Sequence, residues 1–236
     1  IRLSLVGSEM CIRDRPYSAR SRAIEPFHVM ALLARANELQ AAGHDVIHLE
    51  IGEPDFTTAA PIVEAGQAAL AAGHTRYTAA RGLPALREAI AGFYGQRYGL
   101  NIDPQRILIT PGGSGALLLA SSLLVDPGKH WLLADPGYPC NRHFLRLVEG
   151  GAQLVPVGPE VNYQLNADLV ERYWDHDSVG ALVASPANPT GTVLDREALA
   201  GLSRATRAHN GHLVVDEIYH GLTYGCLLYT SPSPRD

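Results

Sequence analysis

The sequence is poor in lysine and cysteine, and both scarcities narrow the possible functions. Lys129 is the only lysine among 19 basic residues, so chemistry that needs a lysine amine has one candidate. The three cysteines, Cys11, Cys140 and Cys226, are odd in number and widely spaced. That pattern excludes a disulfide framework and the spacing typical of zinc ligands. The simplest interpretation is a protein of the reducing cytoplasm.

The chain also lacks an excess of charge and a long apolar run. Its net charge is −5, which gives no electrostatic basis for binding nucleic acid or an anionic membrane. No apolar run has the length of a membrane span, and Glu9 and Asp14 make the start unlike a signal peptide. The 46% hydrophobic content is typical of a packed core. At 236 residues, we expect one large domain or part of a two-domain enzyme.

Helical patterns alternate with short, continuous apolar runs along most of the chain. A helical pattern begins at Ser21 and ends before Gly43. Strands are predicted over 46–51, 106–109, 130–134, 153–157, 179–184 and 212–215. Further helices are predicted over 61–72, 84–98, 115–124, 141–149, 166–174 and 195–209. This alternation predicts a three-layer α-β-α fold with a mostly parallel, mixed sheet, in which ligands bind at the carboxyl ends of strands.

The segment that joins the predicted strand 106–109 to the next helix is rich in glycine. Gly112 and Gly113 would let backbone approach an anion closely, and Ser114 adds a hydroxyl donor at a helix N-terminus. An ordinary glycine-rich turn is an equally good interpretation of this run alone. A serine-hydrolase elbow centred on Ser114 is disfavoured, because Ala116 stands where that motif needs glycine.

Three other predicted strands end in polar or aromatic residues. Tyr138 follows the strand 130–134 and could stack on a planar ligand. Asn188 follows 179–184 in a loop fixed by prolines and a glycine. Asp216 ends 212–215, where a buried charge needs a cationic partner, and Tyr219 lies three residues further on. Taken one at a time, such residues are more often structural, as parts of turns, as caps or as packing against a loop.

The order and spacing of the loops are specific where each loop alone is not. Together they resemble the class I aminotransferases, enzymes of fold type I that use pyridoxal 5'-phosphate (PLP). The matching runs are EIGEPDF (50–56), YT (77–78), GLPALR (82–87), TPGGSGA (110–116), PGYP (136–139), NPTG (188–191) and DEIY (216–219). The resemblance covers about residues 20–225 and implies the large domain of that fold, in incomplete form.

The resemblance implies a role for each residue that grips the cofactor. Gly112, Gly113 and Ser114 would hold the PLP phosphate. Tyr138 would stack on the pyridine ring. Asp216 would pair with the pyridinium nitrogen and keep it protonated, which makes the ring an electron sink.

Further implied roles concern the ring oxygen, the substrates and a second subunit. Asn188 and Tyr219 would hydrogen-bond the phenolic oxygen of PLP. Gly52 and Asn188 would contact the substrate, an amino acid or a 2-oxo acid. Tyr77 would reach the phosphate bound in a neighbouring subunit, which implies a homodimer. The resemblance implies neither a nucleic acid nor a membrane as a partner.

The catalytic lysine of the resembled family is missing. In that family a Ser-x-x-Lys segment beyond the Asp-x-x-Tyr run supplies the lysine that forms a Schiff base with PLP and moves the proton. No such segment follows Gly225, and Lys129 lies in a turn before a strand, where we expect a solvated side chain. We therefore expect no catalytic residue in this chain and no transaminase activity from it alone.

The predicted organisation has four parts. Residues 1–16 and 226–236 resemble translated adapter sequence and are expected to be non-native tails. Residues 17–52 would form an N-terminal arm and helix of a small domain, and 53–225 the incomplete PLP-binding large domain.

Two alternatives to an aminotransferase share most of these motifs. One is a PLP-dependent carbon–sulfur lyase of the same fold. The other is a non-enzymatic PLP-fold module that binds an effector in a transcription regulator. Release of a keto acid, or of thiol and ammonia, would separate the two enzymes.

Overall fold

The computed structural model describes residues 17–24, 28–52 and 56–223. Their contacts divide them into two compact units. The sheet unit contains residues 17–24, 95–100 and 110–223, and the helical unit contains 28–52, 56–94 and 101–109. The two tails predicted to be non-native lie outside the described residues, and the predicted domain boundaries remain predictions.

A four-stranded sheet forms the centre of the sheet unit. Its strands are β1 (His130–Asp135), β2 (Gly151–Pro156), β3 (Ser178–Ala184) and β4 (His212–Asp216). Their order is β2-β1-β3-β4, and all three pairings are parallel. The predicted α/β class is therefore confirmed, and within the described residues the sheet is wholly parallel.

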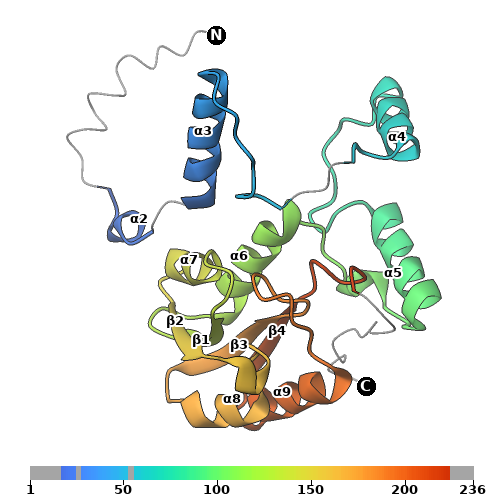
Figure 1. Cartoon of the computed structure of the whole chain (residues 1–236). Helices are drawn as coiled ribbons and strands as arrows, with labels where there is room; N and C mark the ends of the chain where they lie inside the picture. Colours follow the sequence, from blue (N-terminus) through green and yellow to red (C-terminus); the bar gives the residue numbers. More distant parts are fainter. Residues whose placement is uncertain (1–16, 25–27, 53–55, 224–236) are drawn as a thin grey trace. The chain divides into compact units, whose positions relative to one another are not determined.

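Four helices cover this sheet. They are α6 (Gly112–Leu124), α7 (Asn141–Leu147), α8 (Ala167–Tyr173) and α9 (Arg196–Ala208). Figure 1 shows α6 and α7 on one side of the strands and α8 and α9 on the other. Each helix was predicted, and side-chain caps set two of the observed starts: Asn166 accepts from the Leu169 amide before α8, and Asp195 from the Ala198 amide before α9.

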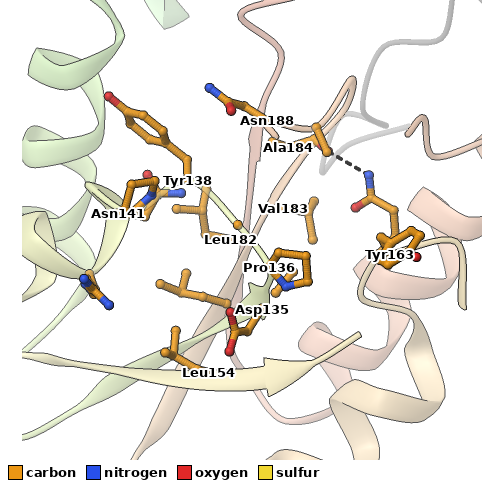
Figure 2. Close-up of a pocket in the computed structure, with 17 residues that line it drawn as sticks. Asp135, Pro136, Tyr138, Asn141, Leu154, Tyr163, Leu182, Val183, Ala184 and Asn188 are labelled. Carbon is orange, nitrogen blue, oxygen red and sulfur yellow. Dashed lines mark hydrogen bonds between the residues drawn. The ribbon is translucent and has the colours of Figure 1, made fainter. Parts of the chain in front are cut away.

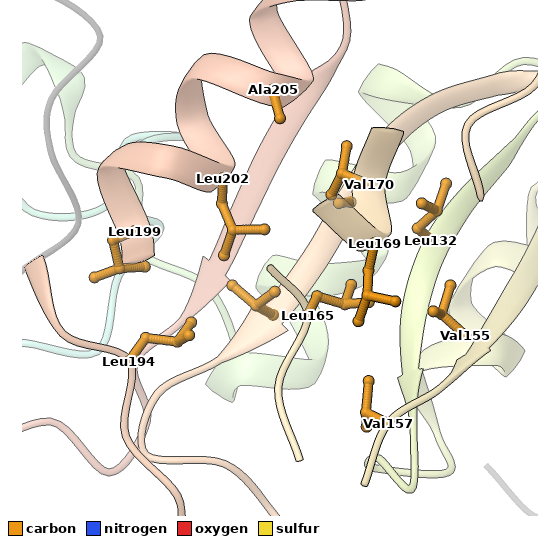
Figure 3. Packing of buried hydrophobic residues seen from close by; sticks show 12 residues of the cluster. Leu132, Val155, Val157, Leu165, Leu169, Val170, Leu194, Leu199, Leu202 and Ala205 are labelled. Atoms are coloured by element: carbon orange, nitrogen blue, oxygen red, sulfur yellow. The ribbon is translucent and has the colours of Figure 1, made fainter. Parts of the chain in front are cut away.

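Alternation along the strands sends side chains into two separate cores. Leu132 of β1 packs in a cluster with the leucines of α8 and α9, drawn in Figure 3. Its neighbours Trp131 and Leu133 point to the opposite face and pack with Leu145 of α7. Burial on both faces explains why the strands read as continuous apolar runs, and it confirms the three-layer arrangement.

Close approach of β3 and β4 leaves room only for glycine at position 180. A Cβ there would lie 2.7 Å from the His212 carbonyl oxygen, a backbone atom that cannot swing away. We therefore expect Gly180→Ala to lower the free energy of unfolding by about 1–3 kcal/mol, measured by urea denaturation. Gly201→Ala is the matched control, because the nearest atom to a Cβ there is 3.8 Å away and alanine favours a helix. Equal stabilities of the two variants would contradict this prediction.

The helical unit holds α3 (His28–Ala41), α4 (Ala60–Ala71) and most of α5 (Pro84–Tyr98). The predictions for α4 and α5 agree with the structure to within one residue. The start predicted at Ser21 is wrong for α3, which begins at His28, and Ser21 lies in a separate short helix, α2 (Ala19–Arg22). In the part of the chain that the structure describes, no helix is both long enough and apolar enough to cross a membrane.

Two strand predictions are wrong. Residues 46–51 are extended but pair with no strand of the described sheet, and Ile47 and Leu49 are more than four-fifths exposed. Residues 106–109 begin at the end of a 3-10 turn, η2 (Pro104–Arg106), and pair with no strand of the described sheet. The Arg106 and Ile107 amides bond within that turn, and the Ile109 amide donates to the Arg81 carbonyl at 3.1 Å. An apolar run becomes a strand only where a neighbouring backbone completes its hydrogen bonds.

Candidate active site

The strand order reverses between β1 and β3. The chain passes from β1 to β2 on one side and then crosses back to β3 on the other, so the loops after β1 and β3 diverge. A crevice opens at that point, as expected for a parallel α/β sheet. Figure 2 shows residues from both strand ends around it. Its polar lining comprises Asp135, Tyr138, Asn141, Arg142, Tyr163, Gln164 and Asn188.

The N-terminus of α6 is free of side-chain caps. The helix begins at Gly112, three residues earlier than predicted, so Gly113 and Ser114 belong to its first turn and not to a preceding loop. Gly112 has φ +71°, a backbone conformation that favours glycine. The preceding Pro111 has no side-chain acceptor for the amides of Gly113 and Ser114, whereas the Gly112 amide donates to the Thr110 carbonyl at 2.8 Å. Unpaired amides and the positive end of the helix dipole together favour an anion such as phosphate.

Asp216 ends β4 next to the last residue of β3. The two strands pair Asp216 with Ala184, and the Ser185 amide donates to the Asp216 carbonyl at 3.0 Å. Its carboxylate accepts from the Ile218 amide, also at 3.0 Å. Among the described residues, no arginine, lysine or histidine forms an ion pair with it, so the cationic partner predicted for Asp216 is not one of these side chains. The carboxylate is therefore available to a cationic ligand.

Tyr138 lies between β1 and α7 and is half-buried. A hydrogen bond with the Cys140 thiol, then burial, then the charges of Cys140, Tyr219 and Asp216 raise the pKa of Tyr138 to about 12. Those charge effects show that Tyr138 lies near Asp216 and Tyr219. The raised pKa keeps the phenol uncharged at physiological pH, and its aromatic face can stack on a planar ring.

The raised pKa gives a testable titration. Because the folded value lies above the ordinary 10.0, Tyr138 contributes stability that is complete below pH 10 and is lost as the pH rises towards about 12. We expect Cys140→Ala, which removes the largest cause, to bring phenolate formation at Tyr138 to lower pH. The measurement is an ultraviolet titration against a Tyr138→Phe reference. An unchanged titration would rule out the thiol as the cause.

The remaining predicted cofactor residues gather around Tyr138. A Cβ at Gly113 would lie 3.7 Å from the Ile218 side chain, so the start of α6 adjoins the turn after β4. Asn188 lines the crevice with Tyr138, as Figure 2 shows. The sheet unit thus brings together seven predicted cofactor residues: Gly112, Gly113, Ser114, Tyr138, Asn188, Asp216 and Tyr219.

Two predicted site residues lie in the helical unit. Tyr77 is fully exposed and lines a hollow with Arg76 and Leu83. Gly52 is in an extended segment with open space around its Cα. The structure does not bring either into the group above, and their roles remain predictions.

Sequence reasoning missed two residues of the crevice. The side-chain oxygen of Asn141 is buried and has no hydrogen-bond partner within the described ranges, which leaves an acceptor for a ligand. Gln164 is buried and donates to the Ala184 carbonyl at 3.0 Å, which braces the end of β3. In the sequence, only the position of Asn141 directly after the Tyr138 loop could have marked it as a site residue. Nothing in the sequence marks Gln164 as a site residue, because it lies in an irregular segment.

Lys129 is remote from this group. Its amine forms an ion pair with Asp177 at 2.9 Å and a bond to the His176 carbonyl at 3.2 Å, so it is a paired side chain and not the freely solvated one that was predicted. It precedes β1, whereas Tyr138 follows the other end of that six-residue strand. The strand alone spans about 16 Å. Lys129 therefore cannot reach a ligand held at Tyr138.

These residues suit one kind of ligand. The start of α6 favours phosphate, Tyr138 offers a neutral aromatic face, Asp216 an unpaired carboxylate and Asn141 an unpaired acceptor. The fold defines a doubly wound α/β protein, and the features just named match the phosphate, the ring and the positive charge of a phosphorylated, cationic aromatic cofactor.

Comparison with known proteins agrees with this class of protein and identifies the family. The chain belongs to the family of class I and II aminotransferases, whose sequence profile matches residues 44–233. Members of this family use PLP. The resemblance seen in the sequence is confirmed.

Curated relatives carry the names of transaminases. Valine–pyruvate aminotransferase of Mycobacterium tuberculosis is 38% identical over 201 residues, which is 85% of this chain and 52% of that protein. (5-Formylfuran-3-yl)methyl phosphate transaminase of Methanocaldococcus jannaschii is 37% identical over 214 residues, or 91% of this chain and 55% of that protein. The chain spans about half the length of the curated relatives it matches.

Solved structures give the same result. An aminotransferase from Mycobacterium tuberculosis superposes with a TM-score of 0.86 at 37% identity, over 92% of this chain and 56% of that one. Aspartate aminotransferase from Thermus thermophilus with maleate gives a TM-score of 0.87 at 34% identity, over 92% and 57%.

Proposed function

We propose that this chain is the cofactor-binding part of a PLP-dependent aminotransferase that moves an amino group between an amino acid and a 2-oxo acid. The observation that carries the proposal is the unpaired Asp216 carboxylate beside the aromatic ring of Tyr138, next to the uncapped start of α6. A carboxylate, an aromatic face and an anion site match the three distinct parts of PLP.

Each residue would act on one part of the cofactor. The amides of Gly113 and Ser114 would bind the phosphate. The N–H groups and the dipole at a helix N-terminus can bind an anion even where no cationic side chain is present. Asp216 would keep the ring nitrogen protonated by offering a charge partner in a half-buried position. PLP, when bound, supplies the electron sink for reactions at the amino acid α-carbon.

Other residues would orient the cofactor and exclude water. Tyr138 would cover one face of the ring, and Asn188 and Tyr219 would hydrogen-bond its phenolic oxygen. Two backbone hydrogen bonds hold the loop around Asn188: the Ala187 amide donates to the Thr192 carbonyl at 2.9 Å, and the Gly191 amide donates to the Ala187 carbonyl at 2.8 Å. The side-chain amide of Asn188 therefore extends from a fixed backbone.

The proton-moving lysine of the reaction is not among the residues of the crevice. Lys129 is engaged with Asp177 at the amino end of β1. The 236-residue chain would therefore bind PLP without a covalent bond and would not transaminate.

The name of one relative, valine–pyruvate aminotransferase, supports the substrate class, because it pairs an amino acid with a 2-oxo acid. The full exposure of Tyr77 supports a role across the interface of a homodimer, where an exposed phenol could reach a neighbouring subunit. The sparse, widely spaced cysteines support a cytoplasmic location.

The activity is tested on the complete protein, obtained from the full coding sequence, with a panel of amino acids and 2-oxo acids. The proposal predicts conversion of one amino acid to its keto acid only when a 2-oxo acid acceptor is present. Release of thiol and ammonia without an acceptor would instead identify a carbon–sulfur lyase. Binding of PLP with neither reaction would favour an effector-binding module.

A further inference from the structure

The turn after β4 carries two of the proposed cofactor residues, Asp216 and Tyr219. Three hydrogen bonds shape it: Ile218 amide to Asp216 carboxylate at 3.0 Å, His220 amide to Glu217 carbonyl at 2.8 Å and Leu222 amide to Tyr219 carbonyl at 3.0 Å. All three are local. They fix the form of the turn but do not attach it to the rest of the sheet unit.

One attachment comes from Tyr98, which lies near the end of α5 and 122 residues before His220 in the chain. Its hydroxyl and Nδ1 of His220 are 2.9 Å apart, in a partly buried hydrogen bond. The two rings also touch, with centroids 4.8 Å apart and planes tilted by 60°. A contact made by both a hydrogen bond and ring packing fixes the position of His220 and the orientation of its imidazole.

The backbone is adapted to the same contact. Gly221 has φ +87°, a conformation that side chains rarely adopt, and a Cβ there would lie 4.0 Å from the Tyr98 hydroxyl. The chain therefore turns sharply directly beside Tyr98. Glycine at 221 and histidine at 220 together bring the end of the turn against this tyrosine.

We propose that Tyr98, acting through His220, is a positioning residue that holds Tyr219 in place to bind the cofactor. The inference rests on the proposed function. Asp216 is held independently, because β4 pairs with β3 up to Ala184 and the Ser185 amide bonds the Asp216 carbonyl. Tyr219 is adjacent to His220 and has no such strand behind it. Loss of the Tyr98 hydroxyl should therefore disturb Tyr219 and leave Asp216 in place.

The test is a set of double-mutant cycles on the 236-residue chain, read out as the dissociation constant for PLP. Tyr98→Phe keeps the ring and removes the hydroxyl, and we expect it to weaken binding about 3- to 10-fold. In a Tyr219→Phe background the same change should have almost no effect. In an Asp216→Asn background it should keep its full effect.

Rescue separates positioning from general destabilisation. His220→Asn can replace Nδ1 by an amide and should keep most of the affinity, whereas His220→Leu should behave like Tyr98→Phe. Tyr173→Phe, which removes a hydroxyl elsewhere in the sheet unit, is the control. A second readout is amide hydrogen exchange in the cofactor-free chain, which Tyr98→Phe should accelerate at His220 and Leu222 only.

Four outcomes would overturn the inference. Unchanged exchange at His220 and Leu222 would show that Tyr98 does not hold the turn. Unchanged PLP affinity of Tyr98→Phe, or an equal loss in the Tyr219→Phe background, would remove the link to the cofactor and leave the proposed function intact. Failure of the unmodified chain to bind PLP would overturn the proposed function, and this inference with it.

Discussion

Asp216→Asn is expected to weaken PLP binding to the 236-residue chain by about 10- to 100-fold, the effect of losing a hydrogen bond to a charged group. Asparagine keeps an oxygen for the Ile218 amide, so the turn after β4 retains its local bond while the negative charge is lost. The same loss is expected for pyridoxal, which lacks the phosphate, because Asp216 acts on the ring nitrogen. The measurement is equilibrium dialysis with each ligand.

The matched control is Asp168→Asn, which removes the same charge from an exposed position in the first turn of α8. We expect it to leave both affinities unchanged. Equal losses in the two variants would mean that Asp216 acts only through net charge, and the assignment of Asp216 to the ring nitrogen would fail.

The second large effect concerns the start of α6. Ser114→Asp is expected to reduce PLP affinity by at least about 100-fold, because a carboxylate would occupy the anion site and repel the phosphate. Binding of pyridoxal should change little. An acidic residue in the first turn of a helix also interacts favourably with the helix dipole, so the thermal stability should not fall.

Ser122→Asp adds the same charge to an exposed position near the other end of α6 and serves as the control. It should leave PLP affinity unchanged and lower stability slightly. A loss of pyridoxal binding in Ser114→Asp as large as the loss of PLP binding would show that the start of α6 does not hold the phosphate.

The sequence predicts the sheet unit well because both faces of its strands are covered. Residues such as Leu132 and Trp131 are buried against opposite helix layers, so β1 reads as an unbroken apolar run. The run 46–51 has the same appearance, but Ile47 and Leu49 are exposed there. Composition alone cannot distinguish the two cases, since the difference lies in whether a neighbouring strand is present.

The sequence predicts those residues of the candidate site that lie in loops directly after predicted strands. Asp216 and Asn188 follow strands, and parallel strands end at a common edge, so their meeting could be expected. Tyr98 could not be found in this way, and Asn141 was marked only weakly, by its place directly after the Tyr138 loop. Tyr98 contacts His220, which is 122 residues further along the chain, and no local pattern predicts such a contact. The side-chain oxygen of Asn141 lacks a partner within the described residues because of how the surrounding side chains pack.

The most direct test of the account is mass spectrometry of the 236-residue chain with one equivalent of PLP, under native conditions and again after borohydride reduction and denaturation. The account predicts a one-to-one complex in the native spectrum and loss of PLP after denaturation, because Lys129 is paired with Asp177 at the far end of β1. A reduced adduct retained on Lys129, or no native complex at all, would contradict it.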